Sequence, residues 1–203
     1  MPRLTRDAVI AACVCYALLL GAALVWLTPA PVSGPPQVTW ERCAQEITAV
    51  DFECATLAVP LDHADPTGET IDVALIRTRA AAPEDRLGSL VVASGGLGVS
   101  GIESLKTGLT DLLPLARRYD LVAMDVRGVG ASTPVTCHSG PEQAGFLEVD
   151  VTPDDAAERA FLADTLRAFA AACAARSGPI FRHLGTTAAA HDLERVRIAL
   201  GEP

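Results

Sequence analysis

The chain has 203 residues, of which 25 are acidic and 16 are Lys or Arg, so its formal net charge is -9. This length is sufficient for one domain with a core of its own and argues against two. Lys and Arg form no cluster after Arg6, so the composition argues against nucleic-acid binding, which needs a basic face.

Residues 1–34 have the features of a targeting segment. Arg3 and Arg6 form a positively charged start, residues 8–27 contain no charge, and the proline-rich stretch TPAPVSGPP follows. An apolar run of about 20 residues can cross a bilayer, whereas the apolar part of a cleaved signal peptide is usually about 7–15 residues long. We therefore favour an uncleaved membrane anchor or, as the alternative, a cleaved signal peptide, with residues 35–203 exported. The protein is then either anchored outside the cytoplasm or secreted.

Four cysteines follow this segment, and export would place them in an oxidising compartment. An even number in that setting predicts two disulfides, with free buried thiols as the alternative. Of the three pairings that four cysteines allow, we favour Cys43–Cys54 and Cys137–Cys173, because each closes a local loop. The Cys and His spacings match no zinc site, and we expect no metal and no other cofactor.

The exported part begins with two strand patterns. Apolar and polar residues alternate over 53–62 and over 70–80, and the turn-like HADPTGE separates the two runs, which predicts an antiparallel hairpin. Residues 89–94 and 119–127 are short apolar runs, as expected for strands buried on both faces.

Helices are expected over residues 101–118, 153–176 and 187–200. The second has Thr152 as its predicted N-cap. Apolar residues predict the buried faces of the other two: Leu105, Leu109, Leu112 and Leu113 in the first, and Leu193, Val196 and Leu200 in the last. The order of strands and helices predicts an α/β fold in which the first four strands form a sheet that starts antiparallel and continues parallel, with flanking helices.

The glycine-rich stretch LVVASGGLGVSG (90–101) follows the third strand. Gly95, Gly96 and Gly98 let the backbone turn sharply and direct N–H groups at one spot, and two such donors can stabilise an oxyanion. The alternative is a plain tight turn, a role that glycine often fills.

A second loop, DVRGVGAST (Asp125–Thr133), follows the fourth strand. Arg127 can anchor this loop by hydrogen bonds, and Gly128 and Gly130 permit its turns. Open α/β sheets place their sites at the carboxyl ends of strands, where both loops begin. We interpret the second loop as a structural support of the site that takes no part in the chemistry.

Six segments, in matching order and spacing, resemble exported bacterial serine peptidases of the tripeptidyl aminopeptidase-like family, which has the α/β-hydrolase fold and is related to proline iminopeptidases. They are WERC, ECATLAVPLDHADPTGETIDVALIR, GSLVVASGGLGVSG, YDLVAMDVRGVGASTPVTC, FAAACAARSG and HLGTTAAAHDLERVRIALGE. The resemblance covers residues 40–201 and is to the N-terminal part of family members, which are far longer than this chain.

The resemblance implies aminopeptidase-type hydrolysis of a peptide-like substrate, and it also implies the two disulfides. It implies an oxyanion hole in the first loop, with the backbone N–H of Gly96 or Leu97 as donor. Family members usually read N-P-G-G-P-G-G-S-G here, whereas this chain has Ala93-Ser94, Leu97 and Val99 at the changed positions. We expect the two lost prolines and the added Val99 side chain to weaken oxyanion binding. His191 stands where the family tends to have Arg.

The chain contains no G-x-S-x-G motif, the nucleophile elbow that this fold needs after its fifth strand. Ser100 comes closest but lacks the final glycine. In this fold the catalytic residues follow one another along the chain in the order Ser, acid and His, so all four histidines come too early to act as the base. We expect these histidines on the surface or in loops: His63, His138, His183 and His191. We therefore expect the N-terminal part of a hydrolase that is inactive alone, with the nucleophile after Pro203. The strand at 89–94 would then be an edge open to another chain.

Two alternatives stay open at this point. A neighbouring reading frame could supply the elbow, acid and His in a complementing C-terminal chain, so that the protein is half of a split hydrolase. The protein could instead be a membrane-tethered, non-catalytic binding module that uses the hydrolase cleft. The substrate is not predictable, because the specificity pockets of this family lie in the part that the resemblance does not cover.

Overall fold

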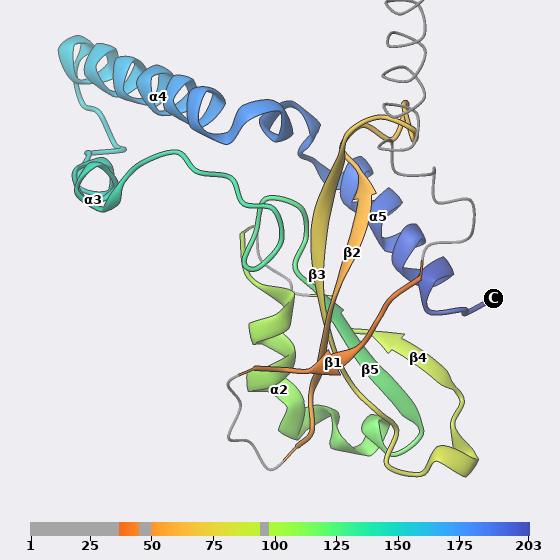
Figure 1. Ribbon diagram of the computed structural model, residues 1–203. Coiled ribbons are helices and arrows are strands. Elements are labelled where there is room, and N and C mark those ends of the chain that lie inside the picture. Colours follow the sequence, from red (N-terminus) through yellow and green to blue (C-terminus); the bar gives the residue numbers. More distant parts are fainter. Residues whose placement is uncertain (1–36, 45–49, 94–97) are drawn as a thin grey trace, which may run out of the picture. The chain divides into compact units, whose positions relative to one another are not determined.

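A mixed sheet with the strand order β1-β2-β3-β5-β4 organises the computed structural model, which describes residues 37–44, 50–93 and 98–203 (Figure 1). Strands β1, β2, β3 and β5 are antiparallel neighbours, and β4 pairs parallel with β5. The expected α/β class, with an antiparallel start followed by parallel pairing, is therefore confirmed. The strands are β1 (Glu41–Arg42), β2 (Glu53–Pro60), β3 (Thr70–Thr78), β4 (Gly88–Val91) and β5 (Tyr119–Met124), with the short 3₁₀ helix η1 (Pro83–Asp85) before β4.

Strand β1 is an addition to the predicted strands. It has two residues, too few to show an alternating pattern, and it pairs with β2 through Glu41 and Cys54. The Cys43–Cys54 disulfide ties the same segment to β2, with 5.0 Å between the Cα atoms. The segment that precedes β2 is therefore held to the sheet by covalent and backbone bonds together.

Helices α2 (Gly101–Ala116) and α5 (Thr186–Ala199) cover opposite faces of the sheet. Successive strand residues point to opposite faces. Ile76 of β3 therefore packs in one core with Leu105 of α2, and Leu75 packs in the other with Val196 of α5. These four side chains are at most 1% exposed. In Figure 1 the two helices lie to either side of β2 and β3, which explains why β3 is apolar on both faces.

The buried faces of these helices are as predicted except at one leucine in each helix. Leu113 is 52% exposed, whereas Leu105 and Leu109, four residues apart, face the sheet. In α5, Leu193 is 38% exposed, and the buried positions are Asp192 and Val196. The sequence misses Asp192 because nothing local shows that its carboxylate has a partner from another element.

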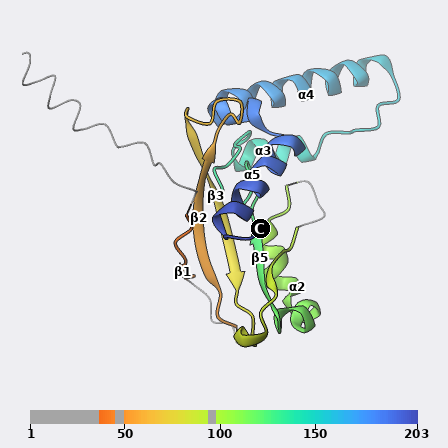
Figure 2. The same cartoon turned by 90° about the vertical axis from the view of Figure 1, so that its right-hand side faces the viewer.

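Residues 136–177 form a helical excursion, called here the α3–α4 excursion, with helices α3 (Gly140–Leu147) and α4 (Ala156–Ser177). Figures 1 and 2 show α4 reaching away from the sheet. Of the described residues of α4, Cys173 alone is buried. The Cys137–Cys173 disulfide closes the excursion, and the rings of His138, Phe146 and Phe169 pack together beside it. The 3₁₀ helix η2 (Gly178–His183) leads back to α5.

Helix α4 begins later than predicted. Asp155 is the N-cap, because its carboxylate accepts the backbone N–H groups of Ala157 and Glu158. Thr152, the predicted N-cap, is instead bonded to Asp150 in the preceding turn. Helix α3 is a further addition to the predicted elements, and a capping box before it is the local signal that indicates it.

The two disulfides of the structure, Cys43–Cys54 and Cys137–Cys173, are the pairings that the sequence favours. Residues 1–36 lie outside the described part. The anchor or signal peptide expected over residues 1–34, and its boundary with residues 35–203, therefore stay predictions. Within the described ranges, no helix has the length and apolar character needed to cross a membrane.

Candidate functional site

The loops that follow β4 and β5 begin at the same edge of the sheet, because these strands are parallel neighbours. The N–H of Val92 donates to the C=O of Val122 at 2.8 Å, so pairing continues to the start of the first loop. The predicted oxyanion residues Gly95–Leu97 lie outside the described residues. The loop is described again from Gly98, which has a φ of +72°.

A buried carboxylate joins the two loops. Asp125 is 1% exposed and follows β5 directly. Its Oδ1 accepts the hydroxyl of Ser100 at 2.6 Å and the N–H of Ile102 at 3.1 Å, and its Oδ2 accepts the N–H of Ala131 at 2.9 Å. A buried charge needs such partners. Asp125 therefore connects the start of α2, which ends the first loop, to the second loop (Asp125–Thr133), called here the DVRG loop.

Glycines make this close junction sterically feasible. A Cβ at Gly130, which has a φ of +57°, would lie 2.0 Å from Oδ2 of Asp125, and a Cβ at Gly101 would lie 2.2 Å from the carbonyl oxygen of Met124. Gly128 also has a positive φ, +87°. Substitution of Gly101 would therefore displace the backbone at the carboxyl edge of β5, and substitution of Gly130 would displace the carboxylate of Asp125.

Ser100 caps helix α2 at the same place. Its hydroxyl oxygen accepts the N–H of Glu103 at 3.1 Å while it donates to Asp125. The N-terminal end of a helix carries a positive partial charge, which favours a carboxylate nearby. Sequence reasoning missed this role, although SGIE (100–103) has the S-x-x-E pattern of a capping box, the signal that could have revealed it.

The DVRG loop is also bonded to β3. The hydroxyl of Ser132 donates to the backbone oxygen of Asp125 at 2.5 Å and accepts the N–H of Ala74 at 2.9 Å. The hydroxyl of Thr133 accepts the N–H of Asp72 at 2.9 Å. These bonds satisfy backbone groups of β3 beyond the end of its pairing with β5, so the loop continues the sheet.

Arg127 is 3% exposed and holds the loop from its other side. Its Nε and Nη2 donate to the two carboxylate oxygens of Asp192, each at 2.7 Å. A guanidinium has five N–H groups, and the other three donate to the carbonyl oxygens of Pro60, Leu61 and His183. Arg127 therefore anchors the loop, and it has no donor left over for a substrate.

The histidines form no hydrogen bond with a serine hydroxyl among the described residues. His63, His183 and His191 lie around one cavity of about 300 Å³, and His138 lies in the α3–α4 excursion. His63 lies in the turn after β2, one of the expected positions, but its side chain is only 15% exposed and it contacts Asp192. In the described part of the chain, no group of three or more His, Cys, Asp or Glu side chains is arranged to hold a metal ion.

No family model matches the chain. Among the curated proteins that it matches is a tripeptidyl aminopeptidase from Streptomyces lividans, which is 32% identical over 171 residues, 81% of this chain and 32% of the relative. The serine protease Hip1 of Mycobacterium tuberculosis is 35% identical over 183 residues, 85% of this chain and 34% of the relative. A protein named carboxylesterase B from the same species is 32% identical over 183 residues, with the same coverage.

The chain spans about a third of the length of these relatives. Their names are those of peptidases and a carboxylesterase, all of them hydrolases. The chain is therefore related to the tripeptidyl aminopeptidase-like hydrolases, as its sequence motifs predict.

Proposed function

We propose that residues 35–203 form the part of an exported α/β-hydrolase serine peptidase that carries the oxyanion loop. The observation that carries this proposal is the junction at Asp125, where one buried carboxylate joins the start of α2 to the DVRG loop. This junction lies at the carboxyl edge of β4 and β5, where open α/β sheets place their sites. The relatives named as peptidases support the same assignment.

In this proposal, the N–H of Gly96 or Leu97 stabilises the negative charge that develops on a peptide carbonyl oxygen when it is attacked. The start of α2, a few residues further along the chain, adds a positive partial charge. Val99 is 48% exposed, so its side chain has room at the surface. The weakening expected of this loop therefore depends mainly on its two missing prolines.

The substrate in this proposal is peptide-like, and the reaction is aminopeptidase-type hydrolysis without a cofactor. The names of two relatives support peptide hydrolysis. The carboxylesterase name of a third relative is compatible with the same site, because ester and amide hydrolysis both pass through an oxyanion. The two disulfides support export, because disulfides persist in oxidising compartments.

We further propose that the 203 residues alone have no hydrolase activity. No serine stands in a G-x-S-x-G elbow. The hydroxyls of Ser100 and Ser132, which lie nearest the junction, are bonded to Asp125. A fluorophosphonate probe, which captures activated serines, should leave the purified chain unlabelled while it labels a serine hydrolase added to the same sample. Covalent capture of any serine of this chain would contradict the proposal.

A second candidate function is half of a split hydrolase, and the position of β4 favours it. In the described part of the chain, β4 pairs with β5 and lies at the end of the strand order. Its apolar residues Leu90 and Val91 are only half-buried, and an edge of this kind is a template for another strand. The complementing chain would carry the elbow, acid and His.

The test of this second candidate is co-expression with any product of an adjacent reading frame that contains G-x-S-x-G. Fluorophosphonate labelling should appear only when both chains are present. Adjacent frames without this motif, or a mixture that stays unlabelled, would rule the split hydrolase out.

A further inference from the structure

The rings of His63 and His191 lie next to each other where the turn after β2 meets helix α5. His63 lies in that turn, and its side chain is 15% exposed. His191 is an exposed residue of α5. The ring centroids are 5.0 Å apart, and both residues line the cavity of about 300 Å³. Imidazole is the commonest metal ligand in proteins, so the pair is a candidate for the coordination of one ion.

The hydrogen bonds of Arg127 determine where the proton sits on the uncharged His63 ring. Nη2 of Arg127 lies 3.0 Å from Nε2 of His63, but its two hydrogens go to Asp192 Oδ1 at 2.7 Å and to the carbonyl oxygen of Pro60 at 2.9 Å. Nε2 of His63 therefore donates to Asp192 Oδ1 at 2.8 Å, since a carboxylate oxygen accepts more than one bond. The lone pair of the ring is then on Nδ1.

This arrangement is typical of a histidine that binds a metal. A metal-ligating histidine almost always donates its other ring N–H to a carboxylate, a carbonyl oxygen or a water, which fixes the tautomer and raises the basicity of the free nitrogen. Among the described residues, Nδ1 of His63 has no hydrogen-bond partner. The buried side-chain atom of the described chain that lacks a partner is Nδ1 of His138. Nδ1 of His63 therefore reaches solvent, where it can bind an ion.

The spacing of the two rings fits one tetrahedral zinc ion. Zinc–nitrogen distances are about 2.0–2.1 Å, so two imidazoles on the same tetrahedral ion have ring centres about 5 Å apart. The observed distance between the centroids is 5.0 Å. His191 forms no hydrogen bond or ion pair within the described residues, so its exposed ring can change rotamer and turn a nitrogen to the ion. Coordination therefore requires the rotation of one surface side chain.

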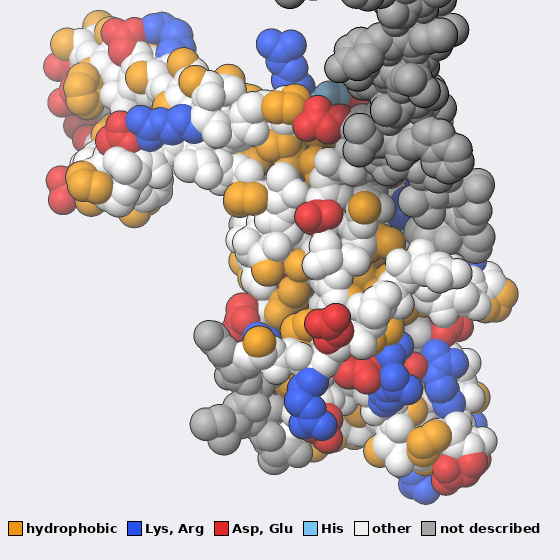
Figure 3. Space-filling model, viewed as in Figure 1, with side chains coloured by type: hydrophobic (Ala, Val, Ile, Leu, Met, Phe, Trp, Pro, Cys, Tyr) orange, Lys and Arg blue, Asp and Glu red, His pale blue; other side chains and the backbone are white. Residues whose placement is uncertain are grey.

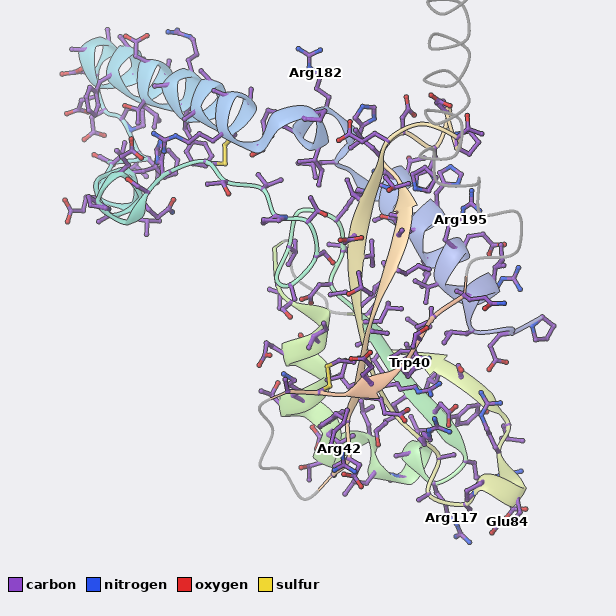
Figure 4. The ribbon with its side chains drawn as sticks, viewed as in Figure 1. Trp40, Arg42, Glu84, Arg117, Arg182 and Arg195 are labelled. Carbon is purple, nitrogen blue, oxygen red and sulfur yellow. A yellow bond between two sulfur atoms is a disulfide. The ribbon has the colours of Figure 1, made fainter. Side chains whose placement is uncertain are left out.

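The charges around the two rings are balanced. The carboxylate of Asp192 lies next to the His63 ring, and the guanidinium of Arg127 is paired with it at 2.7 Å. Asp62 lines the same cavity. Arg182 lines it too, but its side chain points away from the fold in Figure 4. Among the described residues of this cavity, a cation at Nδ1 of His63 therefore has no unpaired positive side chain directed at it.

We propose that Nδ1 of His63 and a ring nitrogen of His191 bind one zinc ion, with water in the other coordination positions. Imidazole suits zinc, whereas Mg²⁺ and Ca²⁺ prefer oxygen ligands. Since the described ranges contain no group of three or more His, Cys, Asp or Glu side chains that could hold a metal, the site has two protein ligands and binds zinc more weakly than a structural site with four.

The bound ion links the turn after β2 to α5. It takes no part in the proposed hydrolysis, because neither ligand belongs to the loops after β4 and β5. The spacing of the histidines along the chain does not indicate this pair, because only folding brings His63 and His191 together.

Zinc titration of the full 203-residue chain, measured by isothermal titration calorimetry, tests the site. Cys13 and Cys15 are alkylated first, because thiolates also bind zinc. The wild type should bind zinc with an affinity that excess Mg²⁺ does not change. His191→Gln should bind at least about tenfold more weakly, because loss of a partner behind a metal ligand already costs about 10–100-fold in affinity. His183→Gln, altered at another histidine of the same cavity, is the matched control and should bind like the wild type.

A second measurement identifies the coordinating atom. In imidazole nitrogen NMR spectra of the wild type, zinc should shift Nδ1 of His63 and leave Nε2 protonated and bonded to Asp192. His63→Gln should lose the site as His191→Gln does, and if that variant does not fold, the NMR measurement replaces it. The proposal is overturned by a wild type that binds no zinc, by equal zinc affinity in the wild type and His191→Gln, by equal weakening in His183→Gln, or by coordination through Nε2 of His63.

Discussion

Two arginine–carboxylate pairs in this protein have similar geometry and opposite surroundings. Arg127 and Asp192 are 2.7 Å apart, with side chains that are 1% and 0% exposed. Arg176 and Glu142 in the α3–α4 excursion are 2.5 Å apart, with side chains that are 41% and 45% exposed. Removal of one partner from a buried pair strands a charge away from water, whereas an exposed pair contributes little. Burial rather than distance therefore decides how much each pair contributes to stability.

The same contrast extends to the two regions around these pairs. Arg127 is bonded by groups from three segments, namely the backbone oxygens of Leu61 and His183 and the carboxylate of Asp192. Helix α4, by contrast, leaves Phe161 and Leu166 at 62% and 48% exposure. Figure 3 shows hydrophobic side chains of the α3–α4 excursion at the surface, between charged ones. Most helical stability in proteins comes from packing of an apolar face. The excursion therefore depends on its disulfide and its aromatic cluster more than the sheet does.

The largest expected effect is that of Asp192→Ala, which leaves the guanidinium of Arg127 buried without its carboxylate. The free energy of unfolding should fall by about 3–5 kcal/mol, measured by urea denaturation. Asp192→Asn keeps the shape of the side chain and an acceptor oxygen, and it should lose less. A loss below about 1 kcal/mol in the alanine variant would show that the pair is not critical.

A matched pair of leucine variants compares the two regions directly. Leu105→Ala removes a fully buried side chain between α2 and the sheet and should cost about 2–5 kcal/mol of unfolding free energy. Leu166→Ala, on the exposed surface of α4, should stay within about 0.5 kcal/mol of the wild type. Equal losses in the two variants would contradict the contrast, and the same urea titration measures both.

Replacement of Cys137 and Cys173 by Ser should loosen the α3–α4 excursion without opening the sheet. Amide protection should drop in α3 and α4 and stay unchanged in β3 and β5, because local opening does not require global unfolding. The variant with Cys43 and Cys54 replaced by Ser is the comparison, since it lacks the disulfide whose Cys54 lies in β2. A loss of β3 and β5 protection in the first variant would show that the excursion and the sheet unfold as one unit.

The smallest effect concerns the exposed pair. The hydrogen bond from Arg176, followed by the backbone and hydroxyl bonds from Ser139, holds the pKa of Glu142 well below its usual range. A depressed pKa in the folded state stabilises the protein above the unfolded value of about 4.3, and this contribution is lost as the pH falls through the folded pKa.

Arg176→Ala should therefore raise the pKa of the Glu142 carboxyl, which a carbon NMR titration of that side chain measures. The urea midpoint of the sheet at neutral pH should not change detectably, because the pair is exposed. A clear shift of that midpoint would contradict the assignment of this pair to a region that is energetically separate from the sheet.

Particular residues show which parts of the site the sequence could predict. The two loops at the ends of β4 and β5 were recognisable, because glycine patterns after apolar strands are local signals. The partners of Asp125 and Arg127 were not recognisable, because Ser100 precedes Asp125 by 25 residues and Asp192 follows Arg127 by 65. A carboxylate on a helix is by itself typical of a solvated surface, and the pattern of α5 gave no sign that Asp192 is buried.

The sequence by itself determined the order of the longer strands and of helices α2, α4 and α5, the antiparallel start of the sheet, the favoured cysteine pairs and the kinship with hydrolases. These features depend on periodicity, turn residues and motif spacing, which are properties of neighbouring residues. Only the tertiary structure decided that Asp125 joins two loops, that Arg127 uses all its donors within the protein, and that His63 contacts a buried carboxylate. The physical reason is that the charge state and solvation of a side chain depend on partners that folding brings from distant parts of the chain.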